Sequence, residues 1–364
     1  MNPRTAVLSY ALGTGHRRVA ELVQGGLTNL GHDCEHRPLE EWVPWEYDAL
    51  FRSGYLLLAL RFPKVWDYMY NSPFFTRRGK LALPGMGGRV IRRFDRAGLS
   101  ECDLVVATQY NAMEVAADWK RASGSRLKLA VVITDYDVYP LWARPEVDLY
   151  LIPHPDLVPV LTNLGVPEER IAPTGIPVSP FFERTHDGLA VRAALGLDLA
   201  KPTALIFGGG IGAGPLREAV EAFLGLGEWQ ALVVCGLNEK LRRSLKLSAQ
   251  KHSDRLRVLG FRSDMALLMA ASDVVVTKGG GLSLSEALYM GKRVVALPSL
   301  PGQERANIAF LAERGWIRVC EDPRQLGGIL DVPPADSPIS PVSLPLAPLE
   351  AAVGRLDALA RSSL

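Results

Sequence analysis

The feature that most constrains this chain is an alternation of short apolar runs with helix-length segments, which occurs twice along the 364 residues. In the first half, the β-branched runs 103–108 and 127–134 are the clearest examples. Such runs are typical of parallel strands that helices cover on both faces. We therefore predict an α/β fold of two doubly wound, Rossmann-like domains.

A polar, turn-rich segment, SPFFERTHDG, separates the two series and is the expected linker. It divides the chain into an N-terminal domain, 1–180, and a C-terminal domain, 181–345. A last helix at about 349–361 follows a Pro/Ser-rich connector. We expect it to return, so that 349–364 join the N-terminal domain. The two open sheets should face each other across a cleft and bind ligands beyond the carboxyl ends of their strands.

The composition excludes several classes of protein. The apolar segments fall short of the ~20 residues that a membrane-spanning helix needs, and the N-terminal residues resemble a first strand rather than a signal peptide. The four cysteines are scattered, without a C-x-x-C pair. This pattern favours a reducing cytoplasm over a disulfide framework or a zinc site.

Segment 51–98 carries ten Lys or Arg residues against two Asp, together with nine aromatic residues, in a chain of net charge +2. It can bind nucleic acid or an anionic membrane surface, or it can be a solvated face with its aromatic side chains in the core. Its basic residues include Arg77, Arg78, Lys80, Arg92 and Arg93.

The first predicted strand is followed by Gly13-Thr-Gly15-His16 at the start of a helix. A dinucleotide fingerprint would need a third glycine where this chain has Arg18, so an NAD site is disfavoured. The glycines would instead let the backbone approach a ligand closely. His16 could act as a general base, or it could merely cap the helix or pack against it.

Asp135 and Asp137 come at the end of the predicted strand 127–134. A D-x-D pair in this position can hold a divalent metal against a nucleotide diphosphate. Asp135 could instead orient a substrate or His16, or cap the next turn. We favour the orienting role and expect no metal ion.

Two glycine-rich loops, 208–214 and 278–281, each follow a predicted strand and precede a helix. Backbone N–H groups in such loops bind anions, and neither loop is a Walker A motif. Together they are expected to hold one diphosphate. Glu286, farther along the second helix, could accept hydrogen bonds from both ribose hydroxyls.

Further polar groups follow two other strands of the second half. Gln303, Glu304 and Asn307 suit the hydroxyls of a sugar. Phe261 and Arg262 end a strand where backbone groups could contact the edge of a base.

In combination these segments resemble the diacylglycerol glycosyltransferases of bacteria and plastids, the monogalactosyldiacylglycerol synthases and processive glucosyltransferases, which are related to the GlcNAc transferase that makes lipid II. The resemblance spans nearly the whole chain. It rests on GTGHRRVAEL, VVITDYDVYPLWARPEVDLYLIP, LGVPEERIAPTGIPVSPFF, GGGIGAG and TKGGGLSLSEALYMGKRVVALPSLPGQERAN. It implies a GT-B fold, inverting transfer from a UDP-sugar without an essential metal or other cofactor, and a cytoplasmic, monotopic enzyme on the inner face of the cell membrane.

The resemblance also implies roles for particular residues. His16 matches the proposed base, Glu286 the ribose ligand, and the glycines 208–210 and 279–281 the diphosphate loops. Where the family often has a histidine before the tryptophan of its TDF-x-x-H-x-x-W segment, this chain has Tyr139, with Trp142 retained. This departure bears on the choice of acceptor.

We therefore predict an inverting transferase that moves glucose or galactose from a UDP-sugar to a lipid such as diacylglycerol at an anionic membrane surface, with no nucleic-acid partner. Catalysis is assigned to His16 and Asp135. Donor binding is assigned to Gly209, Gly210, Phe261, Arg262, Gly279, Gly280, Gly281, Leu282, Glu286, Gln303, Glu304 and Asn307. Acceptor or membrane contact is assigned to Gly15, Tyr139, Trp142 and the five basic residues named above. The alternatives are a UDP-sugar epimerase, a transferase with a polyprenyl or soluble acceptor, and a UDP-sugar sensor without turnover.

Overall fold

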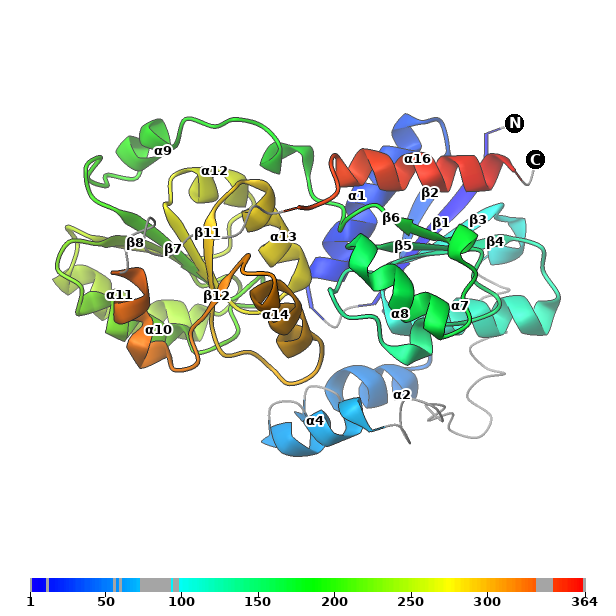
Figure 1. The fold of residues 1–364 in the computed structure, drawn as a ribbon, viewed down its shortest axis with the longest axis horizontal. Coiled ribbons are helices and arrows are strands. Elements are labelled where there is room, and N and C mark those ends of the chain that lie inside the picture. Colours follow the sequence, from blue (N-terminus) through cyan, green and yellow to red (C-terminus); the bar gives the residue numbers. More distant parts are fainter. Residues whose placement is uncertain are drawn as a thin grey trace. The chain divides into compact units, whose positions relative to one another are not determined.

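The chain forms two compact units, Met1–Ser179 with Leu344–Leu364 and Pro180–Ser343. The computed structural model describes residues 2–10, 13–54, 57–58, 61–72, 93, 98–331 and 343–362. Each unit is built on a six-stranded sheet in which every strand pair is parallel, with helices packed around it (Figure 1). The predicted α/β architecture of two Rossmann-like sheets is confirmed.

The sheet of the first unit has the strand order β2-β1-β3-β4-β5-β6. Its central strands consist mainly of buried apolar residues, whereas β2 lies at an edge and is largely polar. The strands are β1 (Arg4–Ser9), β2 (Asp33–Pro38), β3 (Leu104–Ala107), β4 (Lys128–Val132), β5 (Leu149–Ile152) and β6 (Ile171–Pro173). The helices around it include α1 (Gly15–Asn29), α2 (Trp45–Asp48), α4 (Pro63–Asn71), α7 (Tyr110–Ser123), α8 (Val158–Asn163) and α16 (Pro348–Arg361).

Strand β2 is a feature that our sequence analysis did not predict. Its sequence, DCEHRP, has neither an apolar run nor an alternating pattern, yet it pairs with β1 along six residues. As an edge strand it is exposed on one side and needs few apolar side chains. Leu39 follows it, and then the acidic residues Glu40 and Glu41.

The sheet of the second unit has the order β12-β11-β10-β7-β8-β9, and the strands predicted before the two glycine loops are β7 and β10. The strands are β7 (Thr203–Phe207), β8 (Gln230–Val234), β9 (Leu256–Leu259), β10 (Val274–Thr277), β11 (Arg293–Ala296) and β12 (Arg318–Val319). The helices are α9 (Gly188–Ala194), α10 (Leu216–Leu224), α11 (Glu239–Lys251), α12 (Met265–Ala270), α13 (Gly281–Tyr289), α14 (Gln303–Glu313) and α15 (Leu326–Leu330).

Helix α16 packs beside α1 on the first unit, as the sequence predicted for the last helix (Figure 1). The buried His32 links α16 to strand β1, since its Nδ1 lies 2.9 Å from the Thr5 hydroxyl and its Nε2 lies 2.8 Å from the Asp357 carboxylate. Burial would raise the pKa of Asp357, but hydrogen bonds from His32 and Arg361 outweigh it and lower that pKa. The helix is therefore anchored by a polar contact as well as by apolar packing.

No helix in the described part of the chain combines the length and the apolar character needed to cross a membrane.

The packing of α16 on α1 depends on the absence of a side chain at Gly26. A Cβ at Gly26 would lie 2.5 Å from Cγ2 of Val353, whereas a Cβ at the neighbouring Gly25 would meet nothing within 4 Å. Gly→Ala inside a helix ordinarily stabilises by about 0.5–1 kcal/mol. We predict that Gly25→Ala raises the urea midpoint of unfolding, and that Gly26→Ala lowers it because overpacking costs about 1–3 kcal/mol.

The same urea titrations provide a control. Val353→Ala, which removes the two methyl groups, should recover part of the loss in the Gly26→Ala background. Equal midpoints for the Gly25 and Gly26 variants would show that the two helices adjust freely at this contact.

Candidate active-site residues in two parallel sheets

His16 lies at the carboxyl ends of the central strands of the first sheet. It is the second residue of α1, and its Nδ1 lies 3.1 Å from the carbonyl oxygen of Thr108 and 2.6 Å from the hydroxyl of Thr134. Thr108 directly follows β3, and Thr134 follows β4 by two residues. The Thr108 hydroxyl also donates to the carbonyl of His16 at 2.9 Å. Two neighbouring strands therefore hold both the ring and the backbone of this histidine.

These contacts determine which ring nitrogen carries the proton. A carbonyl oxygen can only accept a hydrogen bond, so Nδ1 must be the N–H donor to Thr108. In a neutral ring the lone pair then lies on Nε2, which is the nitrogen that a general base needs. The Thr134 hydroxyl oxygen lies 2.6 Å from the same nitrogen and accepts a hydrogen bond from the same N–H.

The two carboxylates of the D-x-D segment after β4 lie in different settings. Asp135 is partly exposed and comes directly after the threonine that holds His16. Asp137 accepts a short hydrogen bond from Tyr70 of α4. Burial and the charge of Asp135 raise the pKa of Asp137, and together they outweigh the lowering effect of the Tyr70 hydroxyl. Asp137 therefore docks α4, while the predicted role of Asp135 stays a prediction.

Tyr139 and Trp142 belong to an aromatic cluster beside this segment. The Tyr139 ring stacks on Tyr70, with 4.9 Å between centroids and 25° between planes. Trp142 is buried, and its ring meets Tyr110 edge-on at 5.8 Å. Tyr139 thus has a packing role that explains its presence, and contact with an acceptor stays a prediction.

The two glycine loops of the second unit start from neighbouring central strands. Phe207, the last residue of β7, pairs with Thr277, the last residue of β10, so 208–214 and 278–281 begin side by side. A Cβ on Gly279 would lie 2.2 Å from the carbonyl oxygen of Glu304, so only glycine fits there.

Hydrogen bonds hold the second loop in place. The Gly279 N–H donates to the Ser299 hydroxyl at 2.7 Å, and the Asn307 side chain donates to the Gly279 carbonyl at 2.9 Å. Asn307 is fully buried, so it supports the loop from below. A direct contact between Asn307 and a sugar stays a prediction.

The remaining predicted donor residues lie at the carboxyl edge of the same sheet or on its helices. Gly280 caps α13, Gly281 and the buried Leu282 begin that helix, and Glu286 lies partly exposed in its middle. Gln303 and Glu304 begin α14. Gly209 and Gly210 lie in the first loop.

The predicted base contact lies at the edge strand β9. Phe261 is 57% exposed, and the Arg262 guanidinium pairs with Asp264, with Nε 2.7 Å from Oδ1. An exposed ring of this kind is available for packing against a base. Contact with uracil stays a prediction.

Several predicted contact residues lie outside the described part of the chain, namely Arg77, Arg78, Lys80 and Arg92. Arg93 is described, and its guanidinium donates to the carbonyl of Val43 at 2.8 Å. Gly15 begins α1 next to His16.

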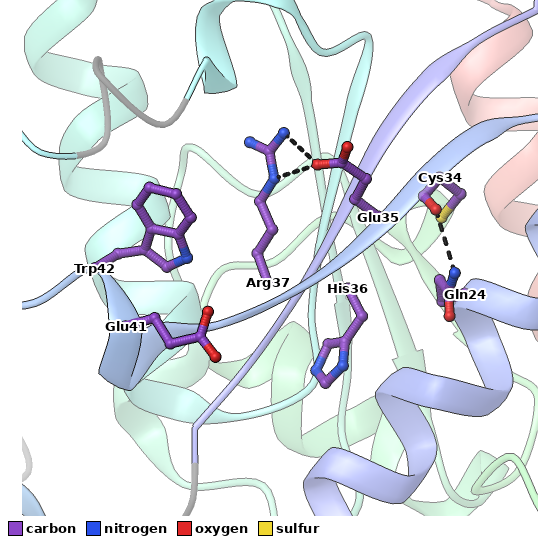
Figure 2. A pocket seen from close by; sticks show the side chains of 7 residues that line it. All are labelled: Gln24, Cys34, Glu35, His36, Arg37, Glu41 and Trp42. Atoms are coloured by element: carbon purple, nitrogen blue, oxygen red, sulfur yellow. Dashed lines mark hydrogen bonds and ion pairs between the residues drawn. The ribbon is translucent and has the colours of Figure 1, made fainter.

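A separate cavity of about 490 Å³ opens at the edge strand β2 (Figure 2). Burial lowers the pKa of His36, whose Nε2 lies 2.8 Å from the Ser9 hydroxyl. The cavity is lined by Gln24, Cys34, Glu35, His36, Arg37, Glu41 and Trp42, and no predicted site residue is among them. Within the described residues, no three His, Cys, Asp or Glu side chains are grouped so that they could hold a metal ion.

Thr108, Thr134 and Lys278 are functional candidates that our sequence analysis missed. Each directly follows a strand or lies within two residues of its end. Their position after the buried strands was the available signal. A threonine or a lysine at such a position does not by itself indicate chemistry.

Two parallel sheets of this kind, with a histidine at the edge of one and paired glycine loops at the edge of the other, define a GT-B glycosyltransferase fold. Solved structures agree: MurG of Acinetobacter baumannii has a TM-score of 0.60 at 16% identity, covering 98% of this chain and 100% of that one. HepE of Anabaena, in complex with UDP and glucose, has a TM-score of 0.56 at 14% identity, covering 99% and 98%.

Sequence comparison finds a more specific similarity. The model for monogalactosyldiacylglycerol (MGDG) synthase matches residues 16–178, and that for the glycosyltransferase family 28 C-terminal domain matches 203–323. A processive diacylglycerol beta-glucosyltransferase of Bacillus cereus is 27% identical over 339 residues, covering 88% of this chain and 83% of that protein. The chain is thus similar over most of its length to MGDG synthases and processive diacylglycerol glucosyltransferases.

The hydrogen bond that His16 Nδ1–H donates to the Thr134 hydroxyl can be tested separately from the histidine. We predict that Thr134→Val lowers kcat of sugar transfer about tenfold to a hundredfold, because the ring loses one of its two orienting contacts. The KM for the donor should stay unchanged, since Thr134 lies in the first unit. Thr134→Ser keeps the hydroxyl and should retain most of the activity.

Steady-state kinetics with matched thermal unfolding curves would check this. An equally active Thr134→Val variant would show that the Thr108 carbonyl alone orients the ring.

Proposed function

We propose that this protein transfers a hexose, glucose or galactose, from a UDP-sugar to the hydroxyl of a lipid such as diacylglycerol, with inversion to a β-glycoside. The observation that carries the proposal is the fixed imidazole of His16, whose Nδ1 is bound by Thr108 and Thr134. Sequence similarity supports the substrate classes, because the relatives matched by this chain are named for diacylglycerol and for β-glucosyl transfer. HepE supports the nucleotide, since it was solved with UDP and glucose.

The proposed reaction is a single displacement. Nε2 of His16 takes the proton of the acceptor hydroxyl while its oxygen attacks the anomeric carbon. The bond from that carbon to the diphosphate oxygen breaks, and UDP leaves with the electron pair. Backbone N–H groups of the two glycine loops and the start of α13 stabilise the charge on the departing diphosphate. These groups supply positive potential themselves, so we propose that transfer needs no resident metal or other cofactor.

The remaining residues are assigned to donor binding in the second unit and to acceptor orientation in the first. Glu286 would bind the ribose, Phe261 would pack near the uracil, and Gln303 and Glu304 would contact the sugar. Asp135, adjacent to Thr134, would orient the acceptor. An epimerase needs carboxylates to handle a bound intermediate and has no use for an acceptor lipid, so sequence similarity favours the transferase.

We further propose that the enzyme binds the anionic inner face of the cell membrane through α2, α4 and the adjoining residues. Five large apolar side chains of this region are between 48% and 76% exposed, and the basic Arg61 and Lys64 lie among them in an exposed setting. The five are Trp45, Leu57, Phe62, Val65 and Tyr68. Apolar side chains mixed with basic ones are typical of surfaces that insert into the headgroup region.

The primary test is transfer from labelled UDP-glucose and UDP-galactose to diacylglycerol in anionic vesicles. We predict a labelled β-glycolipid, and a fall of about 10²–10⁴ in kcat for His16→Ala. UDP affinity should stay at the wild-type value, because the donor residues lie in the other unit. Wild-type turnover in the variant would remove His16 from the mechanism, and label in a soluble or polyprenyl product would replace the acceptor.

The membrane proposal predicts a specific loss of vesicle binding. The double variant Phe62→Ala, Tyr68→Ala should weaken flotation with anionic vesicles about tenfold or more. An apolar side chain that becomes buried in the bilayer contributes about 1.5–3 kcal/mol to the free energy of binding. The effect should persist at high salt, whereas the contribution of basic residues should decline. Leu30→Ala, at a 45% exposed residue outside this surface, serves as the control. Unchanged flotation of the double variant would place the membrane contact elsewhere.

A further inference from the structure

Lys278 lies against both glycine loops and contacts the start of α14. It directly follows β10, and its ammonium forms an ion pair with the Glu304 carboxylate. Both side chains are more than four-fifths buried. Burying an ion pair costs desolvation free energy, which nearby interactions must offset. The surroundings of this pair therefore indicate what the site is built to bind.

The distances from the neighbouring glycines show where the Lys278 side chain lies. A Cβ on Gly209 would lie 3.4 Å from Cε of Lys278, and a Cβ on Gly280 would lie 3.6 Å from its Nζ. The stem therefore lies against the first loop, and the ammonium lies over the residue that caps α13. The glycines leave open the space that a side chain would otherwise fill.

A cation at this place is unfavourable by itself. The start of α13 carries the positive end of the helix dipole, which repels an ammonium group and attracts an anion. Glu304 supplies the negative charge in the structure described here. The start of α13, the N–H groups of the first loop and Lys278 together form a positive setting that matches a diphosphate.

From this geometry we propose that Lys278 exchanges partners when the donor binds: its ammonium leaves Glu304 and binds the diphosphate, and the freed Glu304 carboxylate accepts a hydrogen bond from a hydroxyl of the donor sugar. This inference rests on the proposed function and assigns Lys278 as the charge that takes the place of a metal. The exchange links the two halves of the donor. UDP alone removes the lysine from Glu304 and leaves the carboxylate with only the Leu300 N–H, 3.4 Å from Oε2, whereas a UDP-sugar supplies a new partner to both groups.

Binding measurements on the full chain can separate these contributions. We expect Lys278→Met to weaken UDP binding about tenfold to a hundredfold, as loss of a charge-assisted contact should, while uridine binding is unchanged. Glu304→Gln removes the competing carboxylate, so it should strengthen UDP binding severalfold and reduce the preference for UDP-sugar over UDP. Lys240→Met, at an exposed lysine of the same unit, controls for loss of charge alone.

The outcomes are distinguishable. Wild-type UDP affinity in Lys278→Met, or weaker UDP binding in Glu304→Gln, would overturn the exchange. If Lys278→Met also loses uridine binding, Lys278→Arg decides, because it should restore affinity for both ligands if the charge is what matters and for neither if the site has collapsed. A wild-type protein that binds UDP no better than uridine would instead contradict the proposed function.

Discussion

Parallel pairing within both sheets is the constraint on which the rest of this structure depends. Strands that all run in one direction place every carboxyl end along a single edge, and the connection after each strand starts there. In the first unit this edge brings Thr108 and Thr134 to His16, although they are 92 and 118 residues away along the chain. In the second unit it brings the two glycine loops to Lys278. Residues that are far apart in the sequence are thus brought to one edge of each sheet by the common strand direction.

Most of the fold could be predicted because its central strands are buried on both faces. Such strands consist of Val, Leu, Ile and Ala, and they stand out in the sequence, as β4 and β10 do. Strand β2 could not be found in this way, since an edge strand keeps one side in water and tolerates Asp, Glu, His and Arg. The positions of the glycine loops and of His16 followed from the strands, because each comes directly after one.

The partners of those residues could not be predicted, and the reason is geometric. Which side chain meets His16 depends on strand order, β1-β3-β4, and on register, neither of which a single sequence reveals. Asp135 is the conspicuous residue of its segment, but the less conspicuous Thr134 holds the ring. Similarly, Asp137 of the D-x-D pair binds Tyr70. A neutral hydroxyl and a carbonyl orient the imidazole, and the role that we expected for Asp135 stays a prediction.

The return of α16 to the first unit has a consequence for how the protein is made. The second unit is a continuous stretch of chain, whereas the first consists of two stretches separated by the whole of the second. During synthesis the sheet around His16 is translated first, but the helix that covers α1 and binds His32 is translated last. Domains generally fold as they emerge, from the N-terminus onward. Here the second unit can complete its fold before the first, and until α16 emerges from the ribosome the nascent protein exposes the apolar face of α1 to chaperones and to other nascent chains.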